Sequence, residues 1–152
     1  MFLTATNRLP DAGRELQSAG VAIAADHLRQ NRIVDWYRFT VQEVIEGPDL
    51  LLSFAGTADI LCVQRLQHLF DGYLRREFRI LAIDLSKTDF INSPVWAIIT
   101  LFGKKKPGVR ILIVGMTARI RGSFEMMGLS RELPAYPTLA DARAALNVAA
   151  AE

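Results

Sequence analysis

The sequence predicts an α/β fold, in which an N-terminal hairpin leads into a largely parallel mixed sheet covered by about four helices, all preceded by an N-terminal helical extension. Three patterns predict it. An early segment alternates apolar and polar residues, two later segments are short continuous apolar runs, and segments with apolar residues at helical spacing separate them. Strands that alternate with helices require crossover connections, which are right-handed and favour a parallel sheet.

The chain has 152 residues, of which 51% are hydrophobic and 22% are charged, as in one ordinary globular domain. We assign residues 34–150 to that domain and residues 1–33 to the extension. Residues 11–32 place one residue per turn on a common face: Leu16, Ala19, Ile23 and His27. This stripe is thin, so packing on the domain, pairing with a second copy and mobility all remain open for the extension.

The domain begins with a hairpin. From Trp36, the segment YRFTVQEVIEG alternates apolar and polar residues, and Gly47-Pro48-Asp49 supplies turn residues before LLLSFAG. Residues 58–77 follow as a long helix, because their apolar residues share one face and arginines stand at the end, where the helix dipole favours cations. The apolar face consists of Leu66, Leu69, Phe70, Tyr73 and Leu74.

The next strand and helix are adjacent in the sequence. Residues 78–86 form a short apolar run typical of a strand buried on both faces, and we expect it to be the central strand. Residues 93–108 form the helix that follows, with Gly103 and Pro107 at its end. Its inward residues recur at helical spacing: Val95, Ile98, Ile99 and Phe102.

Four further elements complete the domain. Residues 109–115 form a second buried strand, residues 117–128 a helix and residues 132–137 a short strand. A final helix over residues 138–150 begins at Thr138, which we expect to cap it. The helix over residues 117–128 turns three residues inward: Ile120, Phe124 and Met127.

The charge pattern argues against nucleic-acid binding, since the net charge is only +2 and acidic and basic residues are interspersed. The run Lys104, Lys105 and Lys106 is typical of a solvated helix terminus. No apolar stretch approaches the ~20 residues that span a bilayer, and the opening MFLTATNRLP lacks a signal-peptide pattern. We expect a cytoplasmic protein without membrane insertion.

The sequence also predicts no metal and no cofactor. The lone Cys62 can form neither an internal disulfide nor a thiolate zinc site. The glycine-rich patterns GxGxxG and GxxxxGK[ST] do not occur in the sequence, so a nucleotide site is not supported.

Two long segments resemble a known family. The stretch LAIDLSKTDFINSPVWAII resembles the strand, small turn and following helix of the STAS domain, the family of anti-sigma factor antagonists and stressosome proteins. The stretch ILIVGMTARIRGSFEMMGLSRELPAYPTLADARAAL is also similar to that family, because its residue types follow the family's sequence pattern in the same order. The resemblance covers residues 36–150. It implies a non-catalytic module for protein binding in partner switching, whose partner is an anti-sigma factor related to serine kinases.

The resemblance also implies a site. The family's phosphorylated serine follows an aspartate directly, and the matching position here is Ser93. Asn92 stands where the family usually has Asp, Pro94 where it has Ser or Thr, and Val95 where it has Gly. Ser93 is therefore the candidate phosphoacceptor, and four residues are candidates for partner binding: Asn92, Ser93, Pro94 and Trp96.

The residues alone leave two roles open for Ser93 and Trp96. A serine followed by proline at a strand-to-helix junction is also good capping chemistry. Trp96 lies about 100° from Val95 on a helix, toward the edge of the inward stripe. We expect Trp96 to be at least partly exposed and to anchor a partner, although it could instead tuck against the extension or a neighbouring helix.

Other functions are also compatible with parts of the sequence. A serine hydrolase would use Ser93 as nucleophile with His27 or His68 as base, but INSPV does not match the GxSxG elbow. The family resemblance also implies a possible role as a cytoplasmic subunit of a membrane transport complex. A homo-oligomer formed through the extension is a further possibility.

Overall fold

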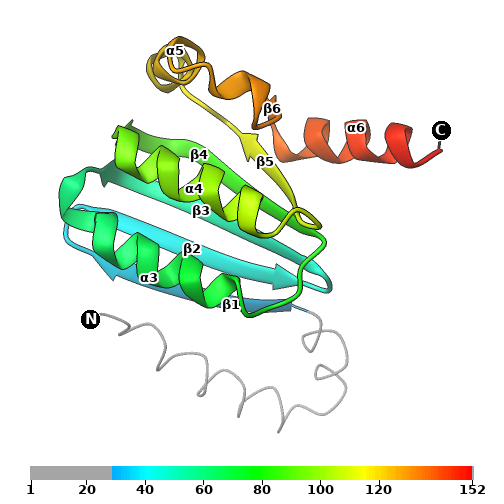
Figure 1. Cartoon of the computed structure of the whole chain (residues 1–152), viewed down its shortest axis with the longest axis horizontal. Helices are drawn as coiled ribbons and strands as arrows, with labels where there is room; N and C mark the ends of the chain where they lie inside the picture. Colours follow the sequence, from blue (N-terminus) through cyan, green and yellow to red (C-terminus); the bar gives the residue numbers. More distant parts are fainter. Residues whose placement is uncertain (1–28, 152) are drawn as a thin grey trace, which may run out of the picture.

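Six strands form one mixed sheet whose spatial order follows the sequence, β1-β2-β3-β4-β5-β6 (Figure 1). The computed structural model describes residues 29–151. The antiparallel strands come first and the parallel ones follow. The strands are β1 (Arg29–Trp36), β2 (Phe39–Glu46), β3 (Asp49–Ala58), β4 (Ile80–Ile91), β5 (Arg110–Val114) and β6 (Ala135–Tyr136).

The helices cover the two faces of this sheet unequally. Consecutive parallel strands joined by right-handed crossovers place every connecting helix on the same face. Accordingly α3 (Val63–Tyr73), α4 (Ser93–Lys105) and α5 (Ala118–Met126) contribute to one large core cluster. The last helix, α6 (Leu139–Ala151), packs through Ala142 in a smaller cluster against β4 and β5. Two short 3₁₀ helices, η2 (Ile60–Cys62) and η3 (Leu129–Arg131), complete the described elements.

The central layer matches the sequence prediction closely. β4 lies between β3 and β5, and Leu81 and Ile83 are fully buried, which confirms the predicted central strand. The predicted stripe of α4 is also confirmed, since Val95, Ile98, Ile99 and Phe102 are all buried. Phe102 meets Phe70 of α3 edge to face, with ring centroids 5.6 Å apart, so aromatic packing joins the two helices.

The predicted hairpin and the final helix cap are also found. β2 and β3 pair around the turn at Gly47 and Pro48, and the Thr138 hydroxyl accepts a hydrogen bond of 3.0 Å from the Asp141 amide. A second turn, at Tyr37 and Arg38, packs against β3. A Cβ on Gly56 would collide with the Arg38 carbonyl oxygen, so this close approach requires glycine.

One expectation about secondary structure and one about burial are wrong in this part of the fold. Residues 29–32, assigned from the sequence to a helix, are the start of β1, where Arg32 is neutralised by Glu43 of β2. The rest of that predicted helix lies outside the described residues. Met127 was expected to face inward, but it is 42% exposed because α5 ends at Met126 and the chain turns at the left-handed Gly128.

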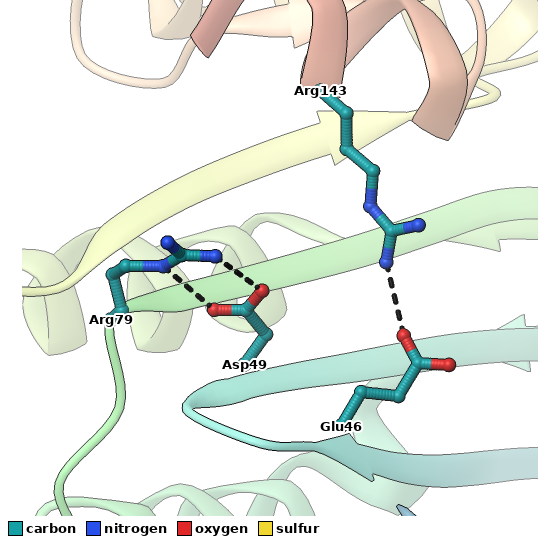
Figure 2. A network of polar contacts seen from close by, with 4 residues as sticks. All are labelled: Glu46, Asp49, Arg79 and Arg143. Atoms are coloured by element: carbon teal, nitrogen blue, oxygen red, sulfur yellow. Dashed lines mark hydrogen bonds and ion pairs between the residues drawn. The ribbon is translucent and has the colours of Figure 1, made fainter. Parts of the chain in front are cut away.

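Charged pairs lie at the end of the sheet at which β3, β4 and β5 begin (Figure 2). The Arg79 guanidinium donates two hydrogen bonds, of 3.1 and 2.9 Å, to the carboxylate of Asp49, which is buried. Arg143 of α6 donates a hydrogen bond of 3.0 Å to Glu46, which lies at the end of β2. We call these four residues the ion-pair end.

A buried polar network lies between the sheet and α3. Glu43 of β2 is 4% exposed, although it shares the inward face with Val41. Arg32 of β1 binds its carboxylate at 2.7 and 2.8 Å, and the Tyr73 hydroxyl of α3 donates a hydrogen bond to it. Burial, and then the neighbouring Glu43 carboxylate, raise the pKa of Tyr73 well above its ordinary value.

Candidate functional site

Ser93 lies at the carboxyl end of the two central parallel strands. β3 and β4 pair up to Ala58 and Ile91, and the Asn92 amide donates a hydrogen bond of 3.1 Å to the Ala58 carbonyl. β5 pairs with β4 only as far as Asp84. The last residues of β4 therefore project beyond β5 and present the start of α4 at the surface.

Asn92, and not Ser93, caps α4. The backbone of Asn92 is extended, and its side-chain oxygen accepts a hydrogen bond of 3.2 Å from the Val95 amide. Ser93 and Pro94 occupy the first two helical positions, and both are exposed. The sequence left open that Ser93 caps this helix. Asn92 fills that role instead, because its side chain reaches an amide of the first helical turn. The Ser93 hydroxyl is left at the surface.

The start of α4 is a weak anion site. Helix N-termini bind anions through amides that lack partners within the helix. Here Pro94 has no amide hydrogen, and the Val95 amide already donates to Asn92. A phosphate on Ser93 would thus feel the helix dipole but would find few donors in its own helix.

Exposed apolar side chains lie at the same end of the sheet as Ser93. Ile60 and Leu61 are 65% and 66% exposed, and they directly follow Asp59, next to the Ala58 carbonyl that binds Asn92. Phe90, near the end of β4, is 39% exposed. We call Ile60, Leu61, Phe90, Ser93 and Pro94 the Ser93 surface. Exposed apolar groups that gather in one place are typical of interaction sites.

Sequence reasoning missed the apolar part of this surface. It placed Ile60 and Leu61 in the long helix over residues 58–77, whereas they form η2 ahead of α3. The Asp59 carboxylate accepts a hydrogen bond of 3.0 Å from the Leu61 amide and so starts η2. The available signal was an aspartate cap followed by two apolar residues outside the predicted stripe.

A family model described as the STAS domain matches residues 40–142, which include the Ser93 surface. The chain belongs to the STAS domain family. The resemblance seen in the sequence is thereby confirmed, as is the fold that it implied. No curated protein matches the chain in sequence.

Solved structures share this STAS fold. An anti-sigma factor antagonist from Mycobacterium paratuberculosis is 24% identical, with a TM-score of 0.60, and the match covers 72% of this chain and 94% of that one. A putative anti-sigma factor antagonist from Thermotoga maritima is 17% identical, with a TM-score of 0.59 and coverage of 80% and 96%. The unphosphorylated anti-sigma factor antagonist SpoIIAA, described elsewhere as a Bacillus cell fate determinant, is 11% identical, with a TM-score of 0.56 and coverage of 78% and 96%.

Trp96 does not belong to the surface of this STAS domain. It is only 2% exposed, and its ring centroid lies 5.3 Å from that of Phe124 on α5. The expectation that Trp96 is an exposed binding anchor is wrong. Helix α5 covers one side of α4, so α4 buries Trp96 in addition to the residues that face the sheet. Among the described residues, the indole N–H of Trp96 has no acceptor.

The structure also places the residues of the hydrolase alternative. His68 is exposed on α3 and lines a groove beside β1, and no hydrogen bond joins it to Ser93 within residues 29–151. His27 lies outside the described residues. The lysine run ends α4, where Lys104 pairs with Glu132 and Lys106 with Glu77. No helix within residues 29–151 is long and apolar enough to cross a membrane.

Proposed function

We propose that this STAS domain is a non-catalytic regulatory module that binds an anti-sigma factor related to serine kinases through the Ser93 surface. The observation that carries the proposal is an exposed serine at a helix start, at the same end of the sheet as the exposed apolar side chains of Ile60, Leu61 and Phe90. Family membership and structural neighbours described as anti-sigma factor antagonists support the class of partner.

The apolar residues supply binding energy in this proposal. Ile60 and Leu61 each expose about two thirds of their surface. Burial of such a side chain contributes ~1–2 kcal/mol, and a few such residues carry most of the affinity of an interface. Asn92 contributes indirectly, because its cap fixes the direction in which Ser93 leaves the strand.

Phosphorylation of Ser93 is the proposed switch. SpoIIAA, which shares this fold, has been described in unphosphorylated and phosphorylated forms. A phosphate adds a charge of about −1.5 to −2. Because Pro94 and the Asn92 cap leave few amides to hold that charge, it would stay among the apolar groups of the Ser93 surface. Its desolvation at an interface would cost a few kcal/mol and release the partner.

A pull-down from the native host, scored by mass spectrometry, tests both parts. The wild-type chain should retrieve a kinase-like anti-sigma factor, and Ser93→Asp and Leu61→Ser should each lower its recovery at least about tenfold, equivalent to ~1.4 kcal/mol. The matched control is Ser130→Asp, which adds the same charge at an exposed serine of η3. Phosphate should be found on Ser93 in chains taken from cells.

Two results would overturn the proposal. Recovery of the same partner by Ser93→Asp and by Leu61→Ser would remove the Ser93 surface from the interface. Retrieval of membrane transport components in place of an anti-sigma factor would assign the domain to the transport branch of the family.

A further inference from the structure

A groove runs between the edge strand β1 and helix α3. Its volume is about 790 Å³, and it lies at the edge of the sheet farthest from β6. β1 contributes Arg32, Val34 and Trp36 to its walls, and α3 contributes His68 and Gly72 among others. The groove is separate from the Ser93 surface, since the two share no residue.

The open side of β1 is a second feature of this region. Within residues 29–151, β1 pairs only with β2. Its eight residues span ~26 Å at about 3.3 Å per residue. A long edge strand invites pairing with other chains, and proteins commonly cover such an edge with a helix or loop. An occupant of the groove would lie directly beside this edge.

The chain itself supplies a candidate occupant. Residues 11–28 end one residue before Arg29, the first residue of β1. Near that end of β1, Arg32 is linked through Glu43 to Tyr73, the last residue of α3. A segment that reverses direction over residues 25–28 would therefore run back along the groove. As a helix, residues 11–24 would span ~21 Å, which is comparable with the length of β1.

The charges of the two parts are complementary. The groove is lined by Arg65 and Arg76 and by one acid, Asp71, which sum to +1. Arg32 also lines the groove, but Glu43 neutralises its charge. Residues 11–28 hold three acids and one arginine, which sum to −2. The acids are Asp11, Glu15 and Asp26, and the arginine is Arg14. The segment also has an apolar stripe, which includes Ala19 and Ile23 and can pack against a groove wall.

We propose that residues 11–28 pack into the groove between β1 and α3, with a helix over residues 11–24 that runs in the same direction as α3. The domain then covers its own edge strand. Both helices rise 1.5 Å per residue, so residues of the segment lie beside residues of α3 at a constant difference in residue number. Ala19 comes level with His68, and Ile23 comes level with Gly72, where a Cβ would meet no atom of the described residues within 4 Å.

Disulfide trapping in the full chain tests this arrangement. Two double variants, Ala19→Cys with His68→Cys and Ile23→Cys with Gly72→Cys, are oxidised mildly and separated by non-reducing electrophoresis. The control pairs Ala19→Cys with Ser130→Cys, on η3 near the opposite edge of the sheet. The native Cys62 does not compete, because it is buried and its pKa is raised to about 11.

Both groove pairs should form an intramolecular disulfide at least about tenfold faster than the control, because docking holds the two thiols at a high effective concentration. A covalent dimer would instead assign the groove to the segment of a second copy. Equal rates in groove and control pairs would show that the segment does not dock. Either result overturns the proposal.

Hydrogen exchange on full chains gives an independent measurement if a cysteine variant folds poorly. Ile23→Asp places a charge in the apolar stripe and should speed exchange of α3 amides at least about tenfold. Ser18→Asp places the same charge on the opposite side of the segment and should leave exchange unchanged. Equal exchange in these two variants would contradict the docking.

Discussion

The two ends of the parallel strands differ in how their side chains are satisfied. At the ion-pair end, Asp49 and Glu46 are bound by Arg79 and Arg143. At the opposite end, Ile60 and Leu61 expose apolar surface, and the exposed Lys87 and Asp89 form no ion pair within the described residues. Charges that are already paired offer little to a partner, whereas exposed apolar groups gain from burial. The contrast separates a structural end from the proposed binding end.

The largest expected effect concerns the helix packing beneath the proposed binding end. Trp96→Ala should lower the free energy of unfolding by ~3–5 kcal/mol, because its indole is buried between α4 and α5. The matched control is Leu101→Ala on the same helix, where the side chain is 48% exposed. Urea unfolding measures both. A loss for Trp96→Ala as small as that for Leu101→Ala would mean that the Ser93 surface does not rest on a packed helix.

An intermediate effect concerns Tyr73, near the ion-pair end. Because the pKa of Tyr73 is raised in the folded state, its contribution to stability is complete below the ordinary tyrosine pKa of about 10 and is lost as pH rises through the folded value. The wild-type chain should therefore lose stability above about pH 10 more steeply than Tyr73→Phe. At neutral pH the variant should be about 1.5–3 kcal/mol less stable, because Tyr73 donates to a buried carboxylate.

Urea unfolding at several values between neutral and alkaline pH measures this difference. Tyr37→Phe is the control, because Tyr37 is 77% exposed, and its pH profile should follow that of the wild type. Identical slopes for wild type and Tyr73→Phe would remove the tyrosine from the buried network and weaken the contrast between the ends.

The smallest effect is expected for the outer ion pair. Arg143→Met should change the free energy of unfolding by no more than about 0.5 kcal/mol, since both partners are partly exposed. Chemical unfolding at low and high salt checks this, because the small difference should vanish as salt screens the pair. A loss of several kcal/mol would show that the ion-pair end holds α6 in place.

Regular apolar patterns predicted most of the fold. The buried residues of α4 at Val95, Ile98, Ile99 and Phe102, and the run that became β4, needed only helical or strand periodicity. Ser93 was located by family resemblance, and its exposure followed from its place at a helix start. These features depend on residues that are close in the sequence.

Features that depend on contacts between distant elements were missed. β1 places Arg32 on its inward face, and this pattern fits a strand only because Glu43 of the neighbouring strand neutralises the charge. Trp96 is buried because α5, formed by residues more than 20 positions later, covers it. Asn92, and not Ser93, is the N-cap of α4, because β4 extends to Ile91, five residues beyond the predicted apolar run.

The order of the strands has a consequence for how the chain acquires its structure. Each strand pairs with the strand that precedes it in the sequence, so no strand must wait for a partner from the far end of the chain. Short sequence separations between contacting elements favour rapid folding. A growing chain could add β1 to β6 one at a time during synthesis. The antiparallel strands β1 to β3 would emerge first, and each later strand would pair with the edge of the sheet already formed.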